Sequence, residues 1–120
     1  KSPLHGYGVF AKEKIKKNEI IEECFYLVQP TIHPYNADYL YRWPQKGDFK
    51  YNVLALGFGS IYNSSKTSNE RGVEWQTDEE NNIFIYRSVK TIEKDEEILT
   101  YYGEKWWNHH NQKYLPKNIE

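Results

Sequence analysis

The residues best suited to chemistry lie near the end of the chain, in the stretch Glu96–Trp107. A short β-prone run ends in Tyr101, Tyr102 and Gly103, and two adjacent tryptophans close the stretch. Aromatic side chains of this size bury about 150–250 Å² each, and the polar tips of tyrosine and tryptophan need hydrogen-bond partners. The residues alone leave two interpretations open: the closing strand of a small β-fold with an aromatic plug, or an aromatic cage that presents one phenol to a substrate.

Two glycines near the N-terminus form a second candidate. Gly6 and Gly8 flank Tyr7 and precede the β-prone run Val9–Ala11. Glycine permits a positive φ and a close approach of another backbone or a ligand. A simple turn into a first strand explains this pattern equally well. A dinucleotide-binding fingerprint is excluded, because no third glycine and no helical pattern follow.

A third candidate is the polar segment Asn63–Asn69, which follows an apolar run broken at Gly57 and Gly59. Glycines inside such a run indicate a sharp turn or close packing against another segment. Asparagine side chains often cap backbone groups in irregular loops. From its residues alone, the segment is therefore predicted only as a loop.

Other chemistries find no support in the sequence. There is no HExxH, Walker or EF-hand motif, and we predict no metal site. The acidic pairs at 22–23, 79–80 and 96–97 are expected to be solvated turns or strand edges rather than acid/base dyads. The histidines lie in polar surroundings without a nucleophile elbow: His5, His33, His109 and His110.

Composition predicts one mostly β domain over residues 1–120. Hydrophobic residues make up 38% of the chain and aromatic residues 17%, so the core is expected to consist largely of rings. A net charge of −1 argues against electrostatic capture of nucleic acid. The single cysteine, Cys24, is expected to be a buried, inert thiol. Without an apolar run of about 18 residues or a signal-peptide pattern, we expect a soluble, intracellular protein.

Short β-prone segments must position the candidate residues. Tyr39, Tyr41 and Trp43 alternate with other residues, which predicts a half-buried strand whose exposed rings could line a peptide groove. Both faces of 83–88 are largely apolar, as in an interior strand. The predicted elements are strands at Ile20–Val28, Ala37–Trp43 and Glu97–Tyr101, a hairpin of Val73–Thr77 and Ile83–Ser88, and a short helix at Trp106–Leu115.

Three stretches, in order, resemble the motifs of the SET domain family of protein-lysine methyltransferases. Gly6–Ala11 is similar to the family's opening G-x-G-[VI]-[FY]-A. Asn63–Ser65, with Asn69 six residues after Asn63, is similar to its Asn-His-Ser…Asn segment, and Asp95–Gly103 to its closing G-E-E-[LI]-x-x-x-Y-G. The resemblance covers nearly the whole chain and is strongest to short, single-domain members of viruses and prokaryotes.

The resemblance implies a fold of small curved sheets with little helix, in which the Asn63 segment and the C-terminal segment cross as a pseudoknot. It implies S-adenosylmethionine on one face and a target lysine entering from the other through a narrow channel. Tyr102 is the implied catalytic tyrosine. The implied cofactor-binding residues are Gly6, Tyr7, Gly8, Asn63, Ser64, Tyr102 and Trp107. We expect the channel at Tyr62, Thr100 and Tyr101, and the peptide groove at Tyr39, Tyr41 and Trp43.

Two departures from the family pattern bear on activity. Ser64 stands where the family usually has histidine, which removes a packing ring. Thr100 stands two positions before Tyr102, where the family often has Phe or Tyr, so the number of methyl groups added is left open.

The first hypothesis is therefore an S-adenosylmethionine-dependent protein-lysine methyltransferase acting on a histone or another protein. A catalytically inactive SET-like peptide-binding module is the second, and a small nucleic-acid-binding β-barrel the third. The resemblance suggests no direct nucleic-acid or membrane partner. Exposed aromatics such as Trp106 would suit a homodimer, and the compartment would be cytoplasmic, or nuclear in a eukaryote.

Overall fold

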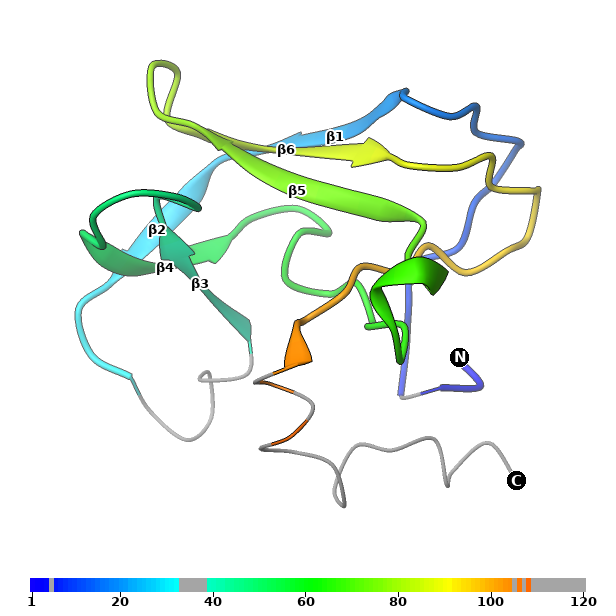
Figure 1. Cartoon of the computed structure of the whole chain (residues 1–120), viewed down its shortest axis with the longest axis horizontal. Helices are drawn as coiled ribbons and strands as arrows, with labels where there is room; N and C mark the ends of the chain where they lie inside the picture. The colour runs from blue at the N-terminus through cyan, green and yellow to red at the C-terminus, as the bar shows by residue number, and fades with distance from the viewer. Residues whose placement is uncertain (5, 33–38, 105, 107, 109–120) are drawn as a thin grey trace. The chain divides into compact units, whose positions relative to one another are not determined.

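The structure is a computed structural model that describes residues 1–4, 6–32, 39–104, 106 and 108 (Figure 1). The chain divides into two compact units, each formed by separate segments. Unit 1 comprises Lys1–Glu19, Ile61–Glu74 and Ser88–Glu120, and unit 2 comprises Ile20–Ser60 and Trp75–Arg87. The described residues form small antiparallel sheets with almost no helix, which confirms the predicted fold class.

The first sheet has the strand order β1-β6-β5 (Figure 1). Its strands are β1 (Ile20–Cys24), β5 (Val73–Asp78) and β6 (Ile83–Ser88). The predicted hairpin of β5 and β6 is confirmed, and β6 is the central strand. Phe84 and Tyr86 on β6 are fully buried while Ile83, Ile85 and Arg87 are half-buried, as expected for an interior strand.

The second sheet has the order β2-β4-β3 and lies in unit 2. Its strands are β2 (Tyr26–Gln29), β3 (Leu40–Trp43) and β4 (Tyr51–Ala55), and both outer strands pair antiparallel with β4. The prediction of one strand over Ile20–Val28 is wrong. The chain leaves the first sheet at Phe25, because residues 20–24 pair with β6 and residues 26–29 pair with β4.

Aromatic rings fill the interior of unit 2. Tyr41 and Trp43 lie 5.1 Å and 5.3 Å from Phe84 between ring centroids, in tilted and edge-on arrangements. Such arrangements place the electropositive edge of one ring against the electronegative face of another. The core thus consists largely of rings, as the composition predicts. The described rings within 6.4 Å of Phe84 are those of Tyr26, Tyr41, Trp43, Trp75 and Tyr86.

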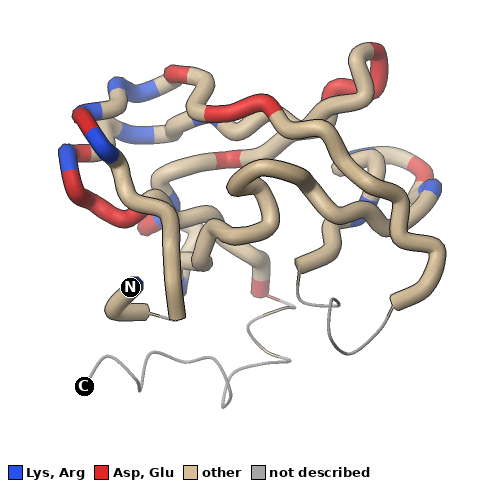
Figure 2. Tube along the Cα trace, turned by 180° about the vertical axis from the view of Figure 1, so that it is seen from behind, with Lys and Arg blue, Asp and Glu red and all other residues tan. Residues whose placement is uncertain are grey.

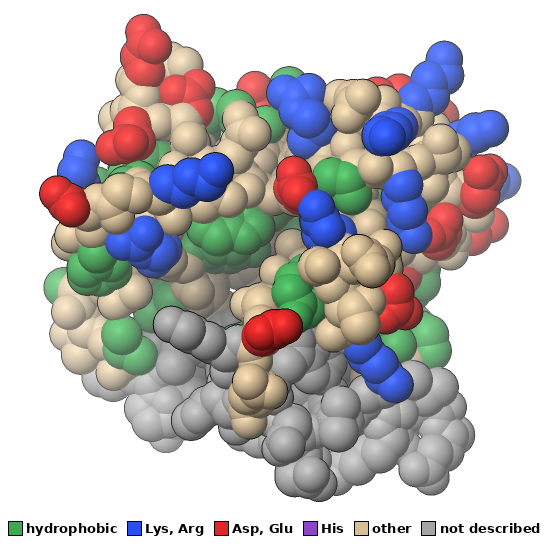
Figure 3. All heavy atoms as spheres, viewed as in Figure 1, with side chains coloured by type: hydrophobic (Ala, Val, Ile, Leu, Met, Phe, Trp, Pro, Cys, Tyr) green, Lys and Arg blue, Asp and Glu red, His purple; other side chains and the backbone are tan. Residues whose placement is uncertain are grey.

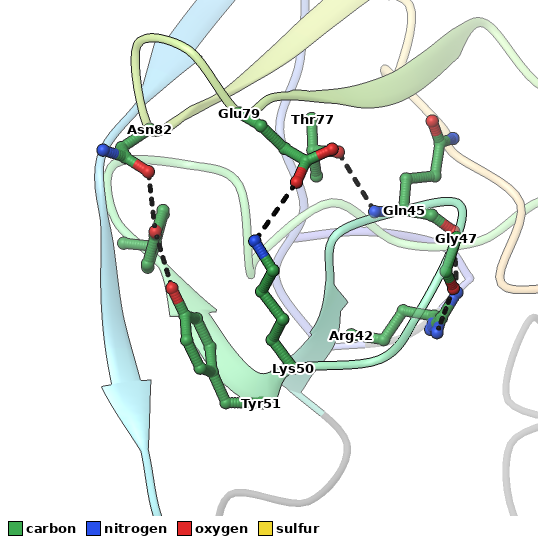
Figure 4. Close-up of polar contacts among 9 residues, drawn as sticks. Arg42, Gln45, Gly47, Lys50, Tyr51, Thr77, Glu79 and Asn82 are labelled. Carbon is green, nitrogen blue, oxygen red and sulfur yellow. Dashed lines mark hydrogen bonds and ion pairs between the residues drawn. The ribbon is translucent and has the colours of Figure 1, made fainter.

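Polar contacts tie the loop after β3 to the β5–β6 hairpin (Figure 4). The backbone N–H of Gln45 donates to Thr77 Oγ1 at 3.0 Å, and Gln45 Nε2 donates to the Trp75 carbonyl at 2.7 Å. Lys50 and Glu79 form an exposed ion pair at 3.4 Å. An exposed pair of this kind adds little stability, so the buried rings beneath it are the main source of order in this region.

Acidic residues gather at the tip of the β5–β6 hairpin, where Asp78, Glu79 and Glu80 follow one another (Figure 2). Lys and Arg side chains lie close to this tip on the face drawn in Figure 3. The two hydrogen bonds from Asn81 lower the pKa of Asp78. The acidic pair Glu79-Glu80 lies exposed in this turn, as the sequence predicts.

Unit 1 is built from short contacts between distant segments rather than from long strands. Phe10 pairs with Glu97 and Ile15 with Ile92 in isolated antiparallel bridges, while residues 64 and 100 pair in a parallel one. The prediction of a continuous strand over Glu97–Tyr101 is wrong. Ile98 donates to residue 9 and Thr100 donates to residue 63, so neighbouring residues serve different partners and no ladder forms.

Helix is scarce in the described part of the chain. It comprises a 3-10 position at Tyr39, a 3-10 turn at Ser68–Glu70, and helical positions at Glu104, Trp106 and Asn108. Most of the helix predicted at Trp106–Leu115 lies outside the described residues. Within the described residues, no helix has the length and apolar character needed to cross a membrane.

Candidate functional site

The side chain of Asn63 joins two of the three motif segments. It is 7% exposed, and its Nδ2 donates to the Tyr7 carbonyl at 3.2 Å and to Glu97 Oε2 at 2.8 Å. Both partners are pure acceptors, so the nitrogen of the amide must face them. The oxygen Oδ1 therefore lies on the other side of the amide, as an acceptor.

The carboxylate of Glu97 makes the second connection in this cluster. Its Oε1 accepts a hydrogen bond from Ser2 Oγ at 2.7 Å, while Oε2 accepts from Asn63. A Cβ placed on Gly8 would lie 2.0 Å from Oε2, so a larger residue here would displace this carboxylate. Gly6 has a φ of +49°, in the left-handed region that glycine adopts without strain. The glycines thus allow the loop to turn and to approach a polar side chain.

Glu97 is the residue that sequence reasoning missed. The expectation that the pair Glu96-Glu97 is a solvated turn or strand edge is wrong for Glu97, which is half-buried and hydrogen-bonded to two distant segments. Nothing in the local sequence distinguishes the two glutamates. In the sequence, Glu97 is marked only by its place two residues after the turn at 94–95. Its pairing with Phe10, next to the glycine loop, is visible only in the structure.

Tyr102 is held at three points. Its hydroxyl donates to the Tyr62 carbonyl at 2.5 Å, and its backbone N–H donates to Ser64 Oγ at 3.0 Å. The ring lies edge-on to Trp106 with centroids 4.6 Å apart. Since a phenol has one proton and that proton is engaged by a carbonyl, the hydroxyl oxygen can meet a further polar group as an acceptor.

Ser64 and Thr100 are buried where the Asn63 segment meets the C-terminal segment. Ser64 is 8% exposed and Thr100 2%. The Thr100 N–H donates to the Asn63 carbonyl at 3.0 Å, and the Ser65 N–H donates to the Thr100 carbonyl at 2.8 Å. Ser64 Oγ also donates to the Ser65 carbonyl at 2.7 Å. Ser64, which stands where the family usually has histidine, thus accepts a hydrogen bond from the Tyr102 backbone.

The remaining channel candidates of unit 1 differ in exposure. Tyr62 is 1% exposed and serves Tyr102 through its carbonyl. Tyr101 is half-buried. Trp107, expected over the adenine, lies outside the described residues.

The groove candidates Tyr39, Tyr41 and Trp43 belong to unit 2 and differ strongly in exposure. Tyr39 is 52% exposed, whereas Trp43 is 1% exposed. Trp43 is therefore not the exposed groove residue that the alternation suggested, because its ring packs against Tyr26 and Phe84 in the aromatic core. Tyr41 donates its hydroxyl to the Gly59 carbonyl at 2.7 Å, and burial raises its pKa to about 12.

The neighbourhood of Cys24 is structural. Burial, with a smaller contribution from the Glu22 charge, raises the pKa of this thiol to about 12, as expected for an inert cysteine. A Cβ on Gly57 would lie 2.5 Å from Glu22 Oε2, and one on Gly59 would lie 2.8 Å from the Tyr86 hydroxyl oxygen. Both glycines pack against other segments, which confirms that part of the sequence prediction.

The similarity of this chain to known proteins agrees with the geometry. The SET domain family model matches residues 6–103. Among curated proteins, the chain is 31% identical over 109 residues to "Histone-lysine N-methyltransferase, H3 lysine-37 specific" of Schizosaccharomyces pombe, covering 85% of this chain and 69% of that protein. Among solved structures, a Plasmodium falciparum "putative histone methyltransferase" is similar with a TM-score of 0.67 and 41% identity, covering 89% of this chain and 92% of that one.

The family match extends from the glycine loop to the glycine that follows Tyr102, so it spans all three motif segments. The relatives of known description are methyltransferases, which favours the enzymatic hypothesis over the inactive binding module. The chain belongs to the SET domain family of S-adenosylmethionine-dependent protein-lysine methyltransferases.

Proposed function

We propose that this chain methylates a lysine of a histone or a similar protein, with the cofactor at the Gly6–Gly8 loop, Asn63 and Ser64, and with Tyr102 at the reacting amine. One observation carries the proposal. Hydrogen bonds join the three motif segments within unit 1: the Asn63 amide reaches the Tyr7 carbonyl and Glu97, and Ser64 Oγ accepts from the Tyr102 N–H.

The donors and acceptors of this cluster fit S-adenosylmethionine. The amide nitrogen of Asn63 is committed to two acceptors, so the amide offers its oxygen, which suits the ammonium group of the cofactor's methionine part. Gly6 and Gly8 carry no side chain, so a ligand can approach the loop backbone closely. When bound, the cofactor supplies the electrophilic methyl group and a positively charged sulfonium.

The protein must hold the target lysine neutral, because only the free amine attacks. For a group with a pKa of about 10.4, this costs roughly 4–5 kcal/mol at pH 7. A nearby positive charge and an apolar channel both lower that pKa. Aromatic walls desolvate the amine and also attract methylammonium groups. The edge-on pair of Tyr102 and Trp106 provides such a wall in unit 1.

Tyr102 would orient the amine rather than act as an obligatory base. Its phenolic proton is engaged by the Tyr62 carbonyl, so the oxygen can accept an N–H from the incoming amine. Methyl transfer is an in-line displacement, and most of its acceleration comes from alignment of the two reactants. The backbone bond from Tyr102 to Ser64 would help to keep this alignment.

The substrate proposal rests on the relatives, both of which are described as histone methyltransferases. We therefore propose a histone lysine as the first substrate to test, and with it a nuclear location. Tyr39, exposed in unit 2, stays a candidate for peptide contacts. A homodimer also stays a prediction.

The test is a calorimetric titration of the chain and of Asn63→Ala with S-adenosylmethionine, followed by transfer of labelled methyl to histone peptides. We expect micromolar binding that weakens at least tenfold in Asn63→Ala, and labelling that requires a lysine in the peptide. Binding of peptide without binding of cofactor would instead support the inactive binding module.

A further inference from the structure

We propose that Glu97 is a positioning residue of the cofactor site, which locks the glycine loop to Asn63 and determines which atom of Asn63 faces the cofactor. This inference rests on the proposed function. It adds a residue that the family motif leaves without a stated role and that the sequence analysis treated only as part of a solvated turn or strand edge.

The backbone and side chain of Glu97 contact segments that are far apart in the sequence. The backbone of Glu97 pairs with Phe10, and the backbone of the next residue donates to the Val9 carbonyl at 2.7 Å. From this base the carboxylate reaches Asn63, 34 residues away, and Ser2, 95 residues away. Glu97 thus contacts the N-terminal segment, the segment after the glycine loop and the Asn63 segment at once.

The Glu97 carboxylate lies close to the position that a Cβ on Gly8 would take. The carboxylate occupies the position where any other residue would carry its Cβ, with Oε2 2.0 Å and Asn63 Nδ2 2.9 Å from that point. Carboxylate and glycine are therefore complementary in shape. A side chain at position 8 would therefore displace the Glu97 carboxylate from its place beside Asn63.

Glu97 also orients the side-chain amide of Asn63. A carboxylate only accepts hydrogen bonds, and charge-assisted bonds are stronger than neutral ones. With the carboxylate and the Tyr7 carbonyl on one side, the Asn63 amide is held with its nitrogen toward them. Its oxygen is then fixed as the atom that meets a donor such as the cofactor's ammonium group.

Glu96 offers a matched control on the same segment. Its Oε1 accepts from the Glu93 N–H at 3.0 Å and its Oε2 pairs with Lys90 at 3.5 Å, so it serves the adjacent turn. Glu96→Gln removes one charge of the same type at the neighbouring position without touching Asn63 or the glycine loop.

The experiment measures the dissociation constant of S-adenosylmethionine by calorimetry for the unmodified chain, Glu97→Met, Glu97→Gln and Glu96→Gln. Methionine has a similar length but no acceptor, so we expect binding to weaken about 10- to 100-fold, the effect of losing a hydrogen bond to a charged group. Glutamine can accept from Asn63 through its oxygen and donate to the Ser2 hydroxyl, so it should bind within about threefold of the unmodified chain. Glu96→Gln should match the unmodified chain.

A double-mutant cycle separates positioning from general loosening of the fold. In the Asn63→Ala background, Glu97→Met should add less than about a threefold loss, because the side chain that it orients is already absent. An equal loss in both backgrounds, or no loss in Glu97→Met, overturns the inference and leaves the proposed function standing. Failure of the unmodified chain to bind the cofactor overturns both. Unfolding midpoints without cofactor check that each variant is folded at the temperature of the titration.

Discussion

Different kinds of interaction stabilise the interior of unit 1 and the interior of unit 2. Unit 2 contains the β2-β4-β3 sheet and most of the β1-β6-β5 sheet, over a core of rings around Phe84. Unit 1 contains isolated bridges and hydrogen bonds that join side chains to distant side chains and backbone groups. The side chains of Asn63, Ser64 and Glu97 take part in these bonds. Burial of apolar area is non-directional, whereas a hydrogen bond requires one distance and one angle.

This difference separates stability from site geometry. Removal of a ring from unit 2 forfeits much buried area but changes no group of the proposed cofactor site. Removal of one polar atom from unit 1 forfeits about 1 kcal/mol of stability, yet it releases a group that we propose positions a reactant.

Trp43→Ala should have the largest effect on stability. The ring is 1% exposed and lies in the aromatic core, so its loss should lower the free energy of unfolding by about 3–5 kcal/mol. Urea unfolding measures this. Phe49→Ala, at an aromatic residue that is 53% exposed in the same unit, should lose less than about 1 kcal/mol. Similar losses in the two variants would mean that unit 2 does not depend on its ring core.

Tyr102→Phe should have the largest effect on turnover. It removes the oxygen proposed to orient the amine, and we expect kcat to fall about 100-fold, close to the loss of one transition-state hydrogen bond. The cofactor dissociation constant should stay within about threefold. Steady-state methyl transfer and calorimetry measure the two quantities. A variant with unchanged kcat would remove Tyr102 from the reaction.

Gly8→Ala should weaken cofactor binding about tenfold, because its Cβ would displace the Glu97 carboxylate from a point 2.0 Å away. Gly47→Ala is the matched control in unit 2. Gly47 has a φ of +87° and open space around its Cβ, so alanine should cost about 1 kcal/mol of stability without altering cofactor affinity. Equal affinities in all three proteins would contradict the role of the glycine loop.

Ser64→Ala should leave the Tyr102 N–H without its buried acceptor and lower kcat about fivefold to tenfold. Ser65→Ala removes a buried hydroxyl of the same segment that bonds to the carbonyls of Thr67 and Thr100 instead. Both variants should lose a similar unfolding free energy, but only the first should change kcat. If both change kcat equally, the effect belongs to the segment and not to the Ser64–Tyr102 bond.

The smallest effect concerns pH. The pKa of Cys24 is about 12 in the folded chain against 9.0 as its ordinary value. Below pH 9 the thiol is protonated in both states. Between pH 9 and 12 the unfolded state loses the proton while the folded state keeps it, so stability falls as the pH rises. At pH 10 this amounts to up to about 1 kcal/mol, which Cys24→Ala should abolish in urea unfolding curves at pH 8 and pH 10. Identical pH dependence in both proteins would contradict the burial of the thiol.

Local patterns determined much of this protein in advance. Alternation of apolar residues predicts the β5–β6 hairpin and its interior strand, since that signal reports the two faces of a strand directly. The aromatic content predicts a core of rings. The glycine loop, the Asn63 segment and the Tyr102 strand end carry the family resemblance, because their residue types and order can be read without knowing what they touch.

Which strands and side chains pair with one another depends on the tertiary structure. The β-branched and aromatic residues of Ile20–Val28 do not reveal that the segment changes partners at Phe25. The alternation that contains Trp43 does not distinguish a groove face from a core face. Glu97 is the clearest case. Its two partners lie 34 and 95 residues away, and Glu96 beside it has the same side chain but bonds within its own turn. A hydrogen bond over such a separation depends on where the folded backbone places both groups, and no local pattern encodes that distance.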